Sequence, residues 1–159
     1  MSEDARFEDG GEAPLRLMAY DAEDLAVISA LAQDAVFPAT EMRWQPARRR
    51  FAALINRFRW EDVEQAARRR RPVERTQSLL VVSDVEKVQT QGVDPSEKDL
   101  VMSLLSVSFE PGEDGTGRVI LTLAGDGAIA LAVEALDVVL QDVTRPYVAP
   151  SRHTPRHPE

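Results

Sequence analysis

The sequence contains no cysteine, only two histidines and few aromatic residues, which make up 6% of its 159 positions. Without cysteine the chain has no disulfide, no thiolate metal ligand and no thiol nucleophile. A Ser/His/Asp triad needs a histidine within the folded domain, but His153 and His157 both lie close to the C-terminus. Their four-residue spacing would suit a metal pair on a helix, but Pro155 interrupts such a helix. We therefore expect no metal and no cofactor, and we favour a non-catalytic protein.

Phosphate-binding loops and membrane-spanning runs are also missing. The glycines at 112–117 and 125–127 lack the Gly-Lys-Ser/Thr ending of a phosphate loop and indicate turns. The adjacent acids at 23–24, 61–62 and 113–114 fall at predicted helix starts or in a loop, where nothing apolar would raise a carboxyl pKa for acid/base catalysis. No window reaches the roughly 18 apolar residues of a membrane span, and the acidic N-terminus is unlike a secretory signal. We expect a cytoplasmic protein.

The chain has a net charge of −8, but most of its positively charged residues are concentrated in one segment. Residues 43–75 contain eleven arginines against four acids, a net charge of +7, whereas residues 1–42 carry −8 and residues 76–159 carry −7. An exposed arginine face would attract an acidic protein or, through these acidic flanks, a second copy of the chain. The candidate anion- or partner-binding residues are Arg48, Arg49, Arg50, Arg57, Arg59, Arg68, Arg69, Arg70 and Arg71.

Two other interpretations of these arginines stay open. The acidic flanks could neutralise them within one molecule and leave only a solvated, internally paired face. Alternatively, the arginines could grip single-stranded nucleic acid together with Trp44 and Trp60, although a net charge of −8 is unusual for such a protein. The favoured function is a non-catalytic binding or adaptor domain that meets an acidic protein or itself. A nucleic-acid-binding module is the alternative, and no membrane partner is expected.

Local patterns predict one strand and one helix near the N-terminus. Residues 15–20 alternate in the manner of a strand. Asp21 is a good N-cap for a helix over residues 22–34, in which Leu25 and Ile28 follow helical spacing.

The arginine-rich segment is predicted to form two strands and a short helix. Residues 39–60 read as two strands around a polar turn at 45–49. Arg57 and Arg59 share a face of the second strand, and they must reach water or acidic partners because an unpaired buried guanidinium is costly. Residues 61–71 suit a surface helix that ends before a proline.

The C-terminal half is predicted to be rich in strands. Residues 78–82 and 85–90 suit one bent strand, and residues 101–109 place Val101, Leu105, Val107 and Phe109 on a single face. Residues 118–133 form the strongest hairpin signal, around the Asp126-Gly127 turn. Residues 134–143 fit either a helix or a strand.

These elements predict an α+β fold, with a strongly curved antiparallel sheet or partly closed barrel of about seven strands. One helix near the N-terminus would pack against the sheet, and the short connections favour antiparallel pairing. We expect a disordered N-terminal tail at 1–14, a single globular domain at 15–148 and a mobile C-terminal tail at 149–159.

Four segments together resemble a bacterial family of uncharacterised proteins, domain of unknown function 2948. They are "LRLMAYDAEDLAVISALAQDAVF", "RFAALINRFRWED", "SLLSVSFE" and "ALDVVLQDVTRPYVAPS", and they span roughly residues 15–151. The most specific piece is "NRFRWE" at 56–61. The resemblance implies no activity and carries over no catalytic residues. The four arginines at 68–71 depart from the family pattern, so a role for them would be particular to this protein.

Overall fold

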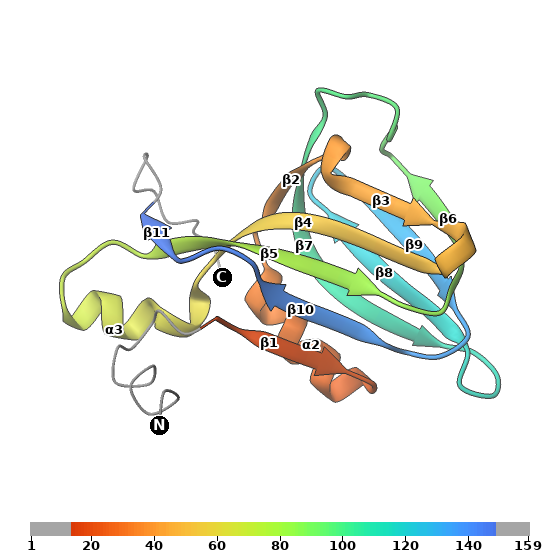
Figure 1. Ribbon diagram of the computed structural model, residues 1–159, viewed down its shortest axis with the longest axis horizontal. Helices are drawn as coiled ribbons and strands as arrows, with labels where there is room; N and C mark the ends of the chain where they lie inside the picture. Colours follow the sequence, from red (N-terminus) through yellow and green to blue (C-terminus); the bar gives the residue numbers. More distant parts are fainter. Residues whose placement is uncertain (1–13, 149–159) are drawn as a thin grey trace.

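The structure is a computed structural model that describes residues 14–148 of the chain. Within this range eleven strands form one antiparallel sheet, accompanied by two short α-helices (Figure 1). The strands are β1 Arg16–Ala19, β2 Val36–Pro38, β3 Met42–Gln45, β4 Arg50–Phe58, β5 Glu74–Val82, β6 Val85–Gln91, β7 Val101–Pro111, β8 Gly117–Leu123, β9 Gly127–Val133, β10 Val138–Asp142 and β11 Tyr147–Val148. The helices are α2 Ala22–Ala32 and α3 Val63–Arg68. The tails predicted at 1–14 and 149–159, with both histidines, lie outside the described residues except for Pro14.

The strands follow one another in the order β1, β10, β5, β4, β2, β7, β8, β9 and β6. Two short strands lie off this path, because β3 pairs with β4 and β11 pairs with β5. The end strands β1 and β6 do not pair with each other within the described residues, so the sheet is open. The α+β class and the antiparallel pairing are confirmed, but eleven strands replace the expected seven because several strands have only two to five residues.

Helix α2 forms where the sequence predicts it. The Oδ1 atom of Asp21 accepts a hydrogen bond from the Asp24 backbone N–H at 2.8 Å, which caps the first turn. Leu25 and Ile28 are buried against the sheet, where the helix packs on β7 and β1. The helix ends two residues before the predicted boundary, and Asp34 beyond it has a left-handed φ of 66°.

The hydrophobic core collects side chains from both halves of the sheet. On β4, Phe51, Ala53 and Ile55 point inward at alternate positions, as the two-residue period of a strand requires. They share one cluster of buried residues with Leu121 on β8 and Ile129 on β9. Arg57 lies on the same face of β4 as these core residues, so its guanidinium is buried inside the protein.

Strand β7 does not present the face that its sequence predicts. Val101 is 62% exposed and Leu105 is 37% exposed, whereas Met102 and Leu104 are buried. The register against β8 shifts between Leu104 and Ser106, so an irregularity of the bulge type interrupts the alternation. The predicted single face of Val101, Leu105 and Val107 is therefore wrong.

The structure contradicts one further prediction, for residues 78–90, and decides between the two alternatives for residues 134–143. Residues 78–90 do not form one bent strand, because β5 pairs with β4 and β10 whereas β6 pairs with β9. Between them Asp84 has a φ of 56°, a left-handed conformation that turns the chain. Residues 134–143 contain the strand β10, not a helix.

Candidate binding arginines and the buried charge network

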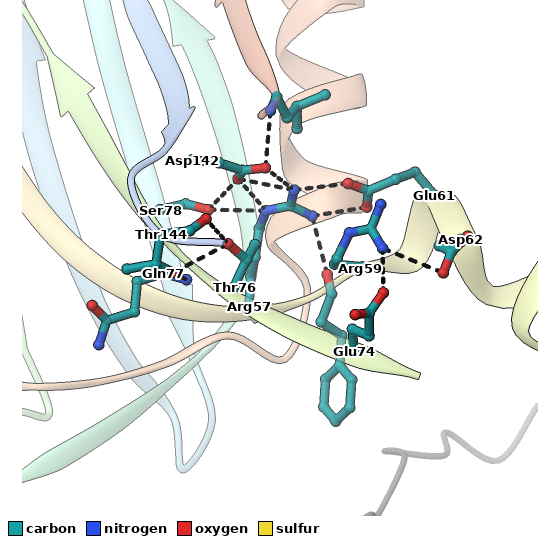
Figure 2. A network of polar contacts seen from close by, with 12 residues as sticks. Arg57, Arg59, Glu61, Asp62, Glu74, Thr76, Gln77, Ser78, Asp142 and Thr144 are labelled. Atoms are coloured by element: carbon teal, nitrogen blue, oxygen red, sulfur yellow. Dashed lines mark hydrogen bonds and ion pairs between the residues drawn. The ribbon is translucent and has the colours of Figure 1, made fainter. Parts of the chain in front are cut away.

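The candidate arginines divide into a buried set and an exposed set. Arg57 on β4 is 0% exposed, and it is among the largest fully buried side chains of the described residues. Figure 2 shows its guanidinium between carboxylates from two sides: Asp142, at the end of β10, and Glu61, just after β4. Ser78 on the intervening strand β5 completes this arrangement.

All three guanidinium nitrogens of Arg57 have partners. Nε donates to Ser78 Oγ at 3.0 Å and to Asp142 Oδ1 at 3.2 Å. One terminal nitrogen donates to Glu61 and to the Phe58 carbonyl, and the other donates to Glu61 and Asp142 over 2.8 to 3.1 Å. Burial by itself would lower the pKa of Arg57, but the hydrogen bonds and negative charges of Glu61 and Asp142 outweigh it and raise that pKa. The charge is therefore held and fully hydrogen-bonded inside the protein.

The same contacts act on the two acids. Burial would raise the pKa of Glu61, but its hydrogen bonds with Arg57 and the charge of that guanidinium lower it. Asp142 also ties down the start of β1, because its Oδ2 accepts a hydrogen bond from the Leu15 N–H at 3.0 Å. Through one arginine and one aspartate, β1, β10, β5 and β4 are joined at the same end.

A second group of charges lies beside the first. Arg59, which is almost completely buried, donates to Glu74 Oε1 at 2.7 Å and to Asp62 Oδ2 at 3.3 Å (Figure 2). Arg71 forms an ion pair with the same Asp62 oxygen at 2.7 Å. These four residues carry two positive and two negative charges, so the group is neutral as a whole.

The expectation of a single outward arginine face is therefore wrong for Arg57 and Arg59. The sequence also predicts that these two arginines need water or acidic partners, and both form ion pairs with acids of the same chain. The sequence gives Asp142 no visible link to Arg57, because 85 residues separate the two. Glu61, four residues after Arg57, was the one local signal of this network.

The exposed arginines lie in two places. Arg48 and Arg50 are exposed at the turn before β4, where Arg49 forms ion pairs with Glu86 and Glu134. The second place is the end of α3, where Arg68, Arg69 and Arg70 are exposed; we call these three residues the arginine run.

Strand β4 separates the two places. It has nine residues, and at about 3.3 Å per residue its ends are more than about 25 Å apart. Figure 1 shows α3 at one end of the molecule and the turn between β3 and β4 at the other. Because exposed charges are screened over roughly 10 Å at 0.1 M salt, the two groups do not act as one patch.

The chain conformation separates the arginine run from Arg71. Arg70 has a φ of 53°, in the left-handed region, directly after the helix. The N–H of Arg71 then donates to the Ala66 carbonyl at 2.9 Å, and its side chain turns inward to Asp62. Within residues 14–148 no hydrogen bond or ion pair joins the side chains of the arginine run to another residue.

The two tryptophans do not lie beside the arginine run as stacking platforms. Trp60 is half-buried, and its indole N–H donates to the Gln33 carbonyl at 2.8 Å while its ring contacts Phe58. Trp44 on β3 packs against the core and lines a pocket near the opposite end of β4.

No group of three or more acidic or histidine side chains in residues 14–148 is arranged to hold a metal ion. In the same range, no helix has the length and apolar character needed to cross a membrane. The pockets in this range include one of about 380 Å³, lined by Trp44, Met42 and Phe51 among others.

Comparison with known proteins gives one finding. Residues 15–157 match the model of a family described as "Protein of unknown function (DUF2948)". No significant match is found among curated proteins or among solved structures.

Proposed function

The chain belongs to the DUF2948 family of proteins of unknown function, so the family supplies no activity. From the surface of this chain we propose that it is a non-catalytic binding or adaptor domain that binds an acidic protein through the arginine run. The observation that carries this proposal is that three consecutive guanidinium groups are exposed without a partner in the described part of the chain. Their neighbours Arg59 and Arg71 are instead held by acids. The arginine run is therefore available for an outside ligand.

Carboxylates are the ligands that these guanidinium groups fit best. A guanidinium can donate two parallel hydrogen bonds to one carboxylate, which gives such pairs both strength and geometric specificity. The chain as a whole carries a net charge of −8, so an acidic partner would be repelled elsewhere and attracted at this end of the molecule. This combination favours one orientation of the partner.

A fluorescently labelled peptide of ten glutamates is the direct probe. We expect saturable binding to the full chain at 50 mM salt, weakened at least tenfold at 300 mM salt because exposed charges are screened. Changing Arg68, Arg69 and Arg70 together to serine should weaken binding at least tenfold. The control changes Arg16, Arg48 and Arg50 to serine, which removes the same charge from other exposed positions. Equal losses in both variants would show that only net charge matters and would contradict the proposal.

A second copy of the chain is another acidic protein that the arginine run could meet. Light scattering at low and high salt measures this directly. If the full chain dimerises at low salt and the serine variant of the arginine run does not, the acidic partner is the chain itself.

Nucleic acid is the alternative ligand, and it has less support. Aromatic stacking next to the basic groups would be needed for single strands, but the Trp60 indole N–H is engaged by Gln33 and Trp44 lies near the other end of β4. Tight binding of a labelled oligothymidylate at low salt, stronger than that of the glutamate peptide, would favour this alternative.

A further inference from the structure

A pocket beside strands β3 and β6 has no part in the proposed function. It has a volume of about 380 Å³ and lies where β3 and β6 approach each other. Within residues 14–148, β3 pairs only with β4 and β6 pairs only with β9, so each has one free edge. The pocket is lined by Ala39, Met42, Trp44, Phe51, Val88, Thr90, Pro95 and Ile129.

Most of the side chains that line this pocket are apolar, and none of them is charged. Seven of the eight lining side chains are those of Ala, Met, Trp, Phe, Val, Pro and Ile, and only Thr90 has a hydroxyl. A charged ligand would lose its hydration there without gaining an opposite charge, which is costly. An apolar ligand would instead bury this surface and its own, at about 25 cal/mol for each Å² removed from water.

Two of the residues that line the pocket have a polar side-chain group. One is the hydroxyl of Thr90, and the other is the indole N–H of Trp44, which donates to no residue in the described range. The second tryptophan behaves differently, because the Trp60 N–H is already bonded to Gln33. These two groups are the side-chain partners that the lining residues have for a single hydroxyl or carbonyl group on a ligand.

We propose that this pocket between β3 and β6 binds a small uncharged apolar molecule with one hydroxyl or carbonyl group. A volume of 380 Å³ is within the usual range of small-molecule sites. Since one water takes up about 30 Å³ of liquid, the pocket has room for a ligand of roughly a dozen non-hydrogen atoms. That is the size of a two-ring aromatic compound.

The probe is 2-naphthol, which is neutral at pH 7, and its charged counterpart is 2-naphthoate. The experiment uses the full chain with Trp60→Phe, which leaves Trp44 as the one tryptophan. We expect 2-naphthol to quench Trp44 emission saturably and 2-naphthoate to bind at least tenfold more weakly. Absence of saturable 2-naphthol binding up to millimolar concentration would overturn the proposal, as would equal affinity for the two probes.

Variants on two faces of β6 locate the binding site. Val88→Phe fills the pocket and should weaken 2-naphthol binding at least tenfold, whereas Gln89→Phe adds the same ring to the other face of the strand and should leave binding within twofold. Thr90→Phe is a second filling variant at an exposed position, for use if Val88→Phe does not fold. Unchanged binding in a folded filling variant would overturn the proposed location. None of these positions belongs to the arginine run, so the two proposals can fail separately.

Discussion

The guanidinium of Arg57 lies 3.0 Å from the carboxylate of Asp142, across strand β5, with both side chains buried. The pair joins a residue in the middle of the chain to one near its C-terminus, and Ser78 on β5 hydrogen-bonds with both. Because the neighbouring strands are held at this point, we infer that Arg57 is a structural element and not part of a binding face.

Removing this guanidinium should destabilise the protein strongly. We expect Arg57→Leu to lower the free energy of unfolding by about 3–5 kcal/mol, because it leaves the buried Asp142 without its charge partner. Adding Asp142→Asn to Arg57→Leu should restore part of the loss, since residue 142 then no longer carries an unpaired buried charge. Urea unfolding measures both variants.

The control for that experiment is the surface ion pair of Arg118 with Glu110, in which both side chains are about half exposed. Arg118→Leu should change the free energy of unfolding by no more than about 1 kcal/mol. The single variant Asp142→Asn completes the comparison. If the double variant were as unstable as the sum of the two single variants, the two residues would not be coupled.

Acid should weaken the same network through Glu61. The pKa of Glu61 is lower in the folded protein than its ordinary value of 4.5, because Arg57 holds the ionised form. Its contribution to stability is therefore fully present above pH 4.5 and is lost as the pH falls through the folded-state pKa. We expect Glu61→Gln to be less stable than the parent at pH 7, with a difference that shrinks steadily below pH 4.5.

Chemical denaturation between pH 3 and pH 7 tests this expectation. The matched control is Glu64→Gln, three residues later, whose side chain is exposed. Its difference from the parent should stay small at every pH. A pH-independent difference for Glu61→Gln would mean that the carboxylate of Glu61 is not stabilised by folding.

Local signals in the sequence were sufficient for the elements that local chemistry decides. Helix α2 begins after Asp21 because that side chain satisfies a free backbone N–H. The hairpin of β8 and β9 forms as predicted, but its turn comprises residues 124–126, because Gly127 already pairs with Leu123 as the first residue of β9. The burial of Arg57 is different, because its partners Asp142 and Ser78 become neighbours only when the sheet forms. The sequence therefore predicts that Arg57 requires water or an acidic partner, but it does not identify Asp142 as that partner.

The candidate site was predictable only in part for the same reason. Consecutive arginines suggest one surface, but the left-handed backbone at Arg70 sends Arg71 inward to Asp62. The pocket near Trp44 gave no sequence signal, since its lining comes from β3, β4, β6 and β9 together with Ala39 and Pro95, and an apolar lining residue reads as an ordinary core residue. Pockets of this kind depend on where strand pairing stops.

The bulge in β7 predicts opposite results for two adjacent leucines. Leu104 is 1% exposed, whereas Leu105 is 37% exposed. We expect Leu104→Ala to lower the free energy of unfolding by about 2–5 kcal/mol, because it removes buried methyl groups and leaves a cavity. Leu105→Ala should cost less than about 1 kcal/mol, since surface substitutions have small effects. Thermal or urea unfolding of the two variants is the measurement. A larger loss of stability for Leu105→Ala than for Leu104→Ala would contradict the bulge and support the sequence prediction that Leu105 faces the core.

The left-handed turn at Arg70 predicts that glycine is tolerated there but not two residues earlier. Glycine adopts a positive φ without the steric cost of a side chain, so Arg70→Gly should leave the free energy of unfolding unchanged or raise it by up to about 1 kcal/mol. Arg68→Gly introduces the same residue into the last position of α3 and should lower it by about 1 kcal/mol. Both variants remove one exposed arginine, so their charge change is matched. Urea unfolding distinguishes them, and equal losses in the two variants would show that the chain does not turn at Arg70.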